Sequence, residues 1–295
     1  MDYSQLGKTI KELRQKAKLT QKELAEGTCT QSQISKIEKG IKLPSSVIMY
    51  EICNKLGVDL RYLFSLSENN KVEYIDNVKS VIRDLIREKE YQKVLEIITF
   101  EENNINFKNK YDQQFLMWHK GIAIYYCKKL KSESLVILKK ALEITAKENH
   151  IHSKIEIEIL NSISVIYGEC KEHSESTKFL KKSLRSCEKI RLDDKKIKIR
   201  ILYNLAKSLA ELKQFEEAAI YAEKGIQECL SQQTLYLLGE LYYESGWNRM
   251  KVNQKDLSIK NFKKSIPIFD IQGMETYKEI VEKELNYAMN VCDSQ

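Results

Sequence analysis

A near-constant period runs through most of this sequence and limits its fold more than any other feature. Apolar or aromatic anchor residues recur at intervals of 40, 42, 42 and 40 residues, at Val78, Trp118, Leu160, Leu202 and Tyr242. A small residue follows each of the last four anchors after 23 residues, at Ala141, Ser183, Gly225 and Ser265. Self-similarity at this period is typical of stacked helix pairs. We therefore expect five pairs and a closing helix over residues 276–291.

The composition excludes a β-rich fold and indicates an all-α protein. Two prolines and ten glycines among 295 residues supply few of the residues that hairpin turns need, and no stretch alternates Val, Ile and Thr as strands do. No secretory segment opens the chain, and no apolar run approaches the ~20 residues of a membrane span. The seven cysteines contain no CxxC pair. We therefore expect a cytoplasmic protein without membrane contact, whose cysteines are buried residues or free thiols.

Two helix starts lie close together near the N-terminus. Thr20 with Glu23, and Thr30 with Gln33, place a hydroxyl and a carboxylate or amide at the spacing of a capping box. The segment between the two starts has room only for a short helix and a turn. This spacing predicts two helices that pack at a steep angle, which is a helix-turn-helix.

The second of these helices separates apolar from polar residues. Ile34 and Ile37 lie on one side. The other side carries Gln31, Ser32, Ser35, Lys36 and Lys39. Amide groups match the donor and acceptor of adenine, and lysine matches guanine or a phosphate. The alternative is an ordinary pair of amphipathic helices, but the exposed face of such a helix would carry Glu and Lys residues that form ion pairs. We therefore interpret this helix as one that enters the major groove of double-stranded DNA.

The net charge of +7 is concentrated in this N-terminal part. Residues 1–66 carry 11 Lys and Arg against 7 Asp and Glu, a net +4, and the other 229 residues carry 38 against 35, a net +3. A basic module suits a phosphate backbone. The excess is small, however, so we expect one copy to bind DNA weakly and a homodimer to be needed.

Residues 6–64 resemble the phage-repressor or Xre-type DNA-binding domain. The resemblance is carried by LGKTIKELRQKAKLTQKELA and by QISKIEKGIKLPS, although Gly27 stands one residue before the position where that family usually has its glycine. It implies that Gln21 binds a phosphate, that Lys39 and Lys42 contact the DNA backbone, and that Arg14 and Glu38 form an internal ion pair. The base edges would be contacted by Gln31, Ser32 and Lys36, with Ser35 on the same face.

The repeats resemble degenerate tetratricopeptide units, of which LYNLAKSLAELKQFEEAAIYAEKGI is the best copy. Together with the N-terminal domain, and with REKEYQKV, GELYYESGWNRM and METYKEI, the chain resembles the PlcR-type peptide-pheromone regulators of Gram-positive bacteria. The expected organisation is a helix-turn-helix domain over residues 1–66, a linker over 67–77, and a right-handed tetratricopeptide-like solenoid over 78–292 that binds a peptide and dimerises.

Asparagines on neighbouring first helices suggest where a peptide would lie. Asn161 and Asn204 fall at similar depths in adjacent repeats, and an amide offers both a donor and an acceptor to an extended backbone. The resemblance adds Phe64, Lys89, Glu240 and Tyr277 to this peptide site. Glu240 departs from the neutral amide of PlcR-type proteins, so we expect a peptide that differs from those of its relatives, with a basic or hydroxyl group near this carboxylate.

These features predict a quorum-sensing transcription factor that binds a pseudo-palindromic operator as a homodimer and is activated by a short, re-imported signalling peptide. Control of the repeats by a protein partner is one alternative, and a phosphatase-like repeat protein with a secondary DNA-binding role is another. We expect no enzyme, cofactor or metal site, because no phosphate loop, GxSxG or HExxH string occurs and the histidines lack ligand spacing.

Overall fold

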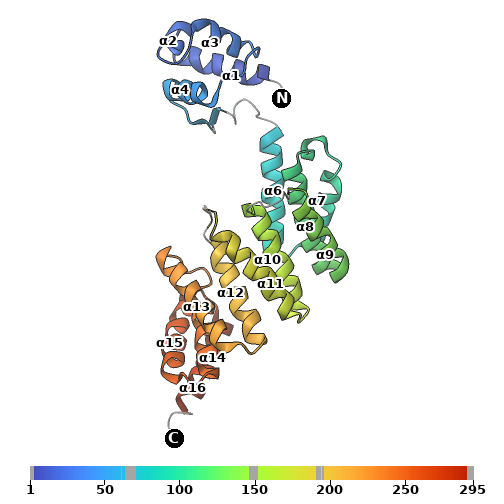
Figure 1. Cartoon of the computed structure of the whole chain (residues 1–295), viewed down its shortest axis with the longest axis vertical. Coiled ribbons are helices and arrows are strands. Elements are labelled where there is room, and N and C mark those ends of the chain that lie inside the picture. The colour runs from blue at the N-terminus through green and yellow to red at the C-terminus, as the bar shows by residue number, and fades with distance from the viewer. Residues whose placement is uncertain are drawn as a thin grey trace. The chain divides into compact units, whose positions relative to one another are not determined.

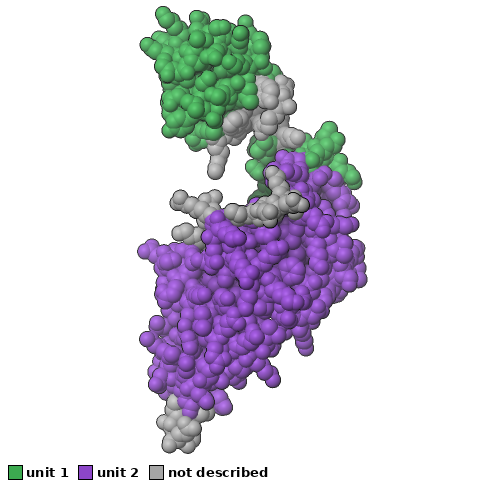
Figure 2. Space-filling view, in the orientation of Figure 1, with its two compact units in different colours: residues 1–90, 103–108 green, residues 91–102, 109–295 purple. Residues whose placement is uncertain are grey.

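The computed structural model describes residues 3–60, 62–63, 71–145, 152–190, 194 and 196–290, which form helices and no strand. Two compact units are present: residues 1–90 with 103–108, and residues 91–102 with 109–295 (Figure 2). Within the described ranges, none of the helices combines the length and the apolar character that crossing a membrane requires. The all-α prediction is confirmed.

The first unit opens with four helices around one apolar core. They are α1 (Tyr3–Lys16), α2 (Gln21–Ala25), α3 (Gln31–Glu38) and α4 (Ser46–Leu56). Their shared core contains Leu6, Ile10, Leu24, Ile34, Ile37 and Ile52. Both predicted capping boxes are present, so α2 and α3 start where the sequence indicated. The turn between them uses Gly27 at φ 69°, a left-handed conformation that glycine adopts without a steric cost.

Gly7 allows α1 to approach the end of α3 at backbone distance. A Cβ atom at this position would lie 2.3 Å from the carbonyl oxygen of Ile37 and 2.8 Å from that of Glu38. Backbone atoms cannot swing aside as a flexible side chain can. Any larger residue at position 7 must therefore displace α3.

The helix α6 (Lys71–Arg87) begins at residue 71, inside the segment 67–77 that was expected to be a linker. Ile75 and Ile82 are buried on one face of α6, and Ile75 extends the apolar face one turn before Val78, where we expected the repeats to begin. Within the first unit, Tyr74 of α6 packs edge-to-face on Phe107 of the short helix η1 (Ile105–Phe107). Phe64 and the rest of residues 64–70 lie outside the described residues.

The second unit is a stack of antiparallel helices in chain order (Figure 1). Its helices are α7 (Tyr91–Glu101), α8 (Lys110–Lys128), α9 (Lys131–Glu143), α10 (Lys154–Glu169), α11 (His173–Cys187), α12 (Lys196–Glu211), α13 (Phe215–Ser231), α14 (Leu238–Lys251), α15 (Lys255–Ile271) and α16 (Glu275–Asn290). The predicted anchors fall in α6, α8, α10, α12 and α14, and the closing helix is α16. The order of helices is therefore the predicted one, although α6 belongs to the first compact unit.

The small residues of the repeat lie where successive helices approach closely. Ala141, Ser183 and Ser265 are fully buried. A Cβ atom on Gly225 of α13 would lie 2.6 Å from the Leu241 side chain of α14. A larger residue at these positions would push neighbouring helices apart, which explains why the period carries small residues.

The joint inside each helix pair has a left-handed backbone. It is formed by Lys89, Lys129, Lys171, Lys213 and Asn253, with φ between 55° and 62°. These positions follow the anchors by 11 residues and so repeat the same intervals. Glycine is the usual residue for this conformation at a helix end. Four of the five joints therefore hold a lysine in a conformation that costs about 1–2 kcal/mol for a residue with a side chain.

Candidate nucleic-acid interface and ligand wall

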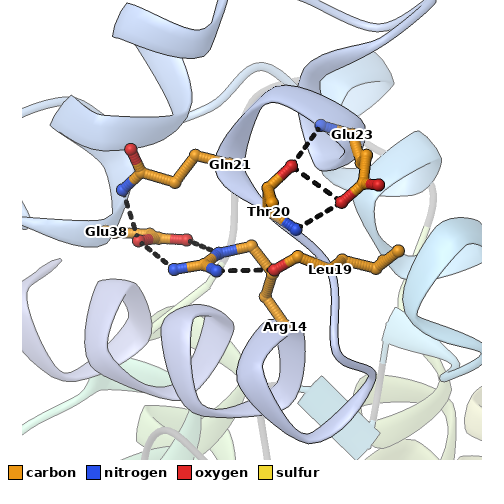
Figure 3. Close-up of polar contacts among 6 residues, drawn as sticks. All are labelled: Arg14, Leu19, Thr20, Gln21, Glu23 and Glu38. Carbon is orange, nitrogen blue, oxygen red and sulfur yellow. Dashed lines mark hydrogen bonds and ion pairs between the residues drawn. The ribbon is translucent and has the colours of Figure 1, made fainter.

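A buried ion pair fixes the orientation of α3 (Figure 3). Arg14 of α1 donates from Nε to Glu38 Oε1 at 2.6 Å and from Nη2 to Glu38 Oε2 at 3.1 Å. Its Nη1 donates to the carbonyl oxygen of Leu19 at 2.7 Å. The hydrogen bond that Arg14 donates to Glu38 raises the pKa of the Arg14 guanidinium. With 9% and 7% of their surfaces exposed, the two residues form the internal pair that the resemblance implied.

Gln21 belongs to the same network (Figure 3). Its Nε2 donates to Glu38 Oε2 at 2.8 Å, so α1, α2 and α3 meet at one carboxylate. The expected phosphate contact of Gln21 is left to its remaining amide hydrogen. The structure thus gives Gln21 a positioning role that the sequence analysis did not foresee.

The face of α3 turned away from the core is polar. Ile34 and Ile37 are buried, whereas Gln31, Ser32 and Lys36 are exposed and Ser35 is half-buried. The two lysines expected at the DNA backbone, Lys39 at the C-cap of α3 and Lys42 just beyond it, are also exposed. The acidic residue of α3, Glu38, is buried in the ion pair. Amides, hydroxyls and ammonium groups therefore face solvent without a competing carboxylate from this helix, as a surface that contacts base edges and phosphates requires.

Polar side chains also join the first helices of successive pairs in the second unit. Trp118 of α8 donates to Ser162 of α10 at 2.9 Å. Arg200 of α12 forms an ion pair with Glu158 of α10 at 2.9 Å. One turn further along, Asn204 Nδ2 donates to Asn161 Oδ1 at 3.0 Å. The first helices thus share a continuous polar side.

The structure brings the two predicted asparagines together but makes them unequal. Asn161 is 6% exposed, and its Oδ1 already accepts the hydrogen bond from Asn204. Asn204 is half-buried, and within the described residues no group donates to its Oδ1. A ligand on this side would therefore meet Asn204 first, with Asn161 behind it.

Glu240 of α14 and Tyr277 of α16 both act electrostatically on Tyr203 of α12. Burial raises the pKa of Tyr203, and the carboxylates of Glu244 and Glu240, followed by Tyr277, raise it further. Burial also raises the pKa of Glu240, whose buried Oε2 has no hydrogen-bond partner among the described residues. Tyr277 is 51% exposed and stacks on Phe269, with ring centroids 5.5 Å apart. We call the side formed by Asn161, Asn204, Tyr203, Glu240 and Tyr277 the ligand wall.

Two residues of this region were missed by the sequence analysis. Tyr203 directly precedes Asn204, and Glu244 lies one helical turn after Glu240, a spacing that could have identified it. Burial raises the pKa of the Glu244 carboxyl to about 7, while Lys207 lowers it and Glu211 raises it. The wall is therefore acidic and aromatic around Glu240.

The structure does not join Lys89 to the other predicted peptide residues. Its side chain is exposed on the joint after α6, and it belongs to the first compact unit, whereas Asn161, Asn204, Glu240 and Tyr277 belong to the second. Its left-handed backbone is shared with four equivalent joints. A function in ligand binding for Lys89 stays a prediction. No cluster of three or more His, Cys, Asp or Glu side chains able to hold a metal occurs within the described ranges.

Comparison with known proteins agrees with this arrangement. Residues 79–289 match the RNPP family C-terminal domain, and residues 10–63 match a helix-turn-helix domain. No curated protein matches the chain. PlcR of Bacillus thuringiensis, solved in complex with the peptide PapR7 and DNA, is similar with a TM-score of 0.76 at 28% identity, over 94% of this chain and 99% of that one.

Two more distant structures share the fold. ComR of S. thermophilus, in complex with DNA and its signalling peptide ComS, has a TM-score of 0.62 at 15% identity, over 96% of this chain and 99% of that one. The pheromone receptor Rgg2 of Streptococcus dysgalactiae has a TM-score of 0.61 at 17% identity, over the same shares. The resemblance to PlcR-type regulators is confirmed. Because the C-terminal match alone covers more than half of the sequence, the chain belongs to the RNPP family.

Proposed function

We propose that this chain is a cytoplasmic transcription regulator, not an enzyme, that binds DNA as a homodimer through α3 and is switched by a short signalling peptide on the ligand wall. The observation that carries the proposal is the end-to-end likeness, at 28% identity, to PlcR in complex with the peptide PapR7 and DNA. The exposed polar face of α3 and the polar ligand wall supply the chemistry for both partners.

In the DNA-binding half, Lys36, Gln31 and Ser32 contact base edges in the major groove. Lys39 and Lys42 contact phosphates. The net +4 of residues 1–66 is small for a monomeric DNA-binding domain. Two copies whose recognition helices lie about 34 Å apart, or a multiple of this, would engage a pseudo-palindromic site.

In the peptide-binding half, Asn204 and Asn161 hold the peptide backbone, and Tyr203, Glu240 and Tyr277 contact its side chains. A peptide amide displaced from water needs a donor and an acceptor, and Asn204 presents both. Peptide binding favours the DNA-binding state, and the DNA-bound protein activates transcription. The shift in population is limited by the difference in the peptide's affinity for the two states.

The DNA-binding half is tested with an operator selected from random DNA by the full-length protein. Lys36→Ala should weaken binding by about 1–3 kcal/mol per half-site at the bases that Lys36 contacts. Lys182→Ala, an exposed lysine of α11, serves as the control and should bind like the unmodified protein. Unchanged affinity of Lys36→Ala for the selected operator would contradict the assignment of α3.

The peptide-binding half is tested by native mass spectrometry of the protein purified from dense cultures of its own host. A dimer that carries a short peptide supports the proposal, and replacing Asn161 and Asn204 by Ala should abolish that added mass. Asn103→Ala, at an exposed position, is the matched control. A co-purifying protein in place of a peptide would favour control by a protein partner.

A further inference from the structure

A cleft of about 310 Å³ opens beside the ligand wall, entirely within the second unit. It lies between the end of α10, the first turn of α11 and the second half of α12. Its chemistry is set by Glu169, His173, Ser176, Asn204, Lys207 and Glu211. Because Asn204 lines the cleft and also belongs to the ligand wall, the two features are continuous.

The charges around the cleft are predominantly negative. The carboxylates of Glu169 and Glu211 oppose the single ammonium group of Lys207, which leaves one negative charge. Glu169 and Glu211 are also the last residues of α10 and α12, whereas one helix, α11, begins at the cleft. Each helix end carries about half an elementary charge, negative at the C-terminus and positive at the N-terminus, so the backbone makes the cleft more negative still.

Lys207 does not neutralise the two carboxylates fully, because its ammonium group also interacts with Tyr203 and Glu244. Its Nζ lies 5.5 Å from the ring centroid of Tyr203. Its charge lowers the pKa of Glu244 on the neighbouring helix α14. The positive charge of Lys207 is therefore shared between the contact of α12 with α14 and the cleft.

Hydrogen-bond acceptors in the cleft are available for a donor. Glu169 accepts a hydrogen bond from the Tyr126 hydroxyl to Oε1 at 2.6 Å, and the Tyr125 hydroxyl also interacts with this carboxylate. An ionised carboxylate has about four acceptor positions, so it can accept a further hydrogen bond. Glu211 is exposed to solvent. His173 Nδ1 is buried without a partner there, and it accepts a hydrogen bond when the ring proton is on Nε2. A primary ammonium group, with three donors and no acceptor, matches this set.

We infer that the cleft binds a primary ammonium group of the peptide, from a lysine side chain or from the amino terminus, while Asn204 holds the adjacent backbone. This inference rests on the proposed function of the ligand wall. An extended chain advances about 3.3 Å per residue, so a residue next to the one at Asn204 is within reach of the cleft. Glu169 and Glu211 are then specificity-determining residues of the regulator.

The test uses the full-length protein and a mixture of short synthetic peptides that contain one lysine, one glutamine or one glutamate among neutral residues. Each set is made with free and with acetylated amino termini, and the peptides retained by the protein are identified by mass spectrometry. We expect peptides with an ammonium group to be enriched about tenfold or more, because hydrogen bonds between charged groups are stronger than neutral ones. Enrichment that acetylation abolishes identifies the amino terminus as the source, and enrichment that survives it identifies lysine.

The E169Q/E211Q variant should lose this preference, since glutamine keeps the shape and an oxygen for Tyr126 but removes both charges. E216Q/E279Q changes two exposed glutamates outside the cleft and should keep the preference. A preference that persists in E169Q/E211Q overturns the inference, and its loss in E240Q would assign the ammonium to Glu240. If peptides are retained without a preference for an ammonium group, the inference alone is overturned. If the protein retains none of the peptides, the proposed function is overturned too. If E169Q/E211Q fails to fold, E211Q replaces it, because Glu211 is exposed.

Discussion

Replacing Arg14 by methionine should destabilise the DNA-binding helix from within. The substitution keeps an apolar stem but leaves the carboxylate of Glu38, whose side chain is 2% exposed, buried without its partner. Breaking a buried pair in this way costs about 3–5 kcal/mol. Gln21 still donates one hydrogen bond to Glu38, so we expect the lower value.

The assay is amide hydrogen exchange of the full-length protein, followed by mass spectrometry of the peptides from α1 and α3. A loss of about 3 kcal/mol accelerates exchange in the slowest amides of these helices by about 150-fold, since 1.4 kcal/mol corresponds to a factor of ten. Peptides of the second unit serve as the internal control, because their exchange should not change.

The double variant Arg14→Met/Glu38→Leu separates the ion pair from the packing. Replacing both charges with apolar residues of similar volume is often neutral or stabilising. We therefore expect α3 to regain most of its protection in the double variant. An acceleration below about tenfold in Arg14→Met, or no recovery in the double variant, would refute the reasoning, because the pair would then be neither desolvated nor coupled.

Three further substitutions test other features. The pKa of Glu244 is about 7 in the folded chain, above its ordinary 4.5, so deprotonation should lower the stability of the fold as the pH rises from about 5 to 8. The urea midpoint should fall over this range in the unmodified protein and in the exposed control Glu216→Gln. It should fall less in Glu244→Gln. Gly7→Ala places a methyl group 2.3 Å from a backbone oxygen and should cost roughly 1–3 kcal/mol or more, seen as faster exchange in α1 and loss of operator binding. Lys213→Gly removes the steric cost of the left-handed backbone at this joint and should raise the free energy of unfolding by about 0.5–1 kcal/mol. Lys182→Gly, inside α11, should lower the free energy of unfolding by about 0.8–1 kcal/mol. Thermal unfolding distinguishes the two variants.

The architecture was readable from the sequence because its signals are local and periodic. Both capping boxes depend on contacts between residues three positions apart, and the anchors mark helices that each pack on their neighbours in the chain. The repeats were expected to begin at residue 78, whereas α6 begins at residue 71. Ile75 lies three residues before Val78 on the buried face of α6, and buried Phe115, Ile157 and Ile199 occupy the same position before their anchors. The signal for an earlier start was therefore present in the sequence.

The ligand wall was less predictable because its chemistry depends on contacts between repeats. The near register of Asn161 and Asn204 suggested that they meet, but not that one would be buried behind the other. The importance of Glu244 and Tyr203 arises from desolvation by α12 and α14 together, which a pattern along one helix does not reveal. Gln21 was assigned to phosphate contact alone because its bond to Glu38 crosses 17 residues.

The hydrogen bond between Asn204 and Asn161 has a consequence for how selective this protein can be. In the free protein Asn204 Nδ2 already donates to Asn161 Oδ1, so a molecule that takes over either of these two groups exchanges one hydrogen bond for another and gains only the difference. Such an exchange is close to neutral when both partners are uncharged. Discrimination among similar molecules must then come from neighbouring groups that form no hydrogen bond within the free protein. Competitors that fit weakly do not gain enough to replace the hydrogen bond between the two asparagines.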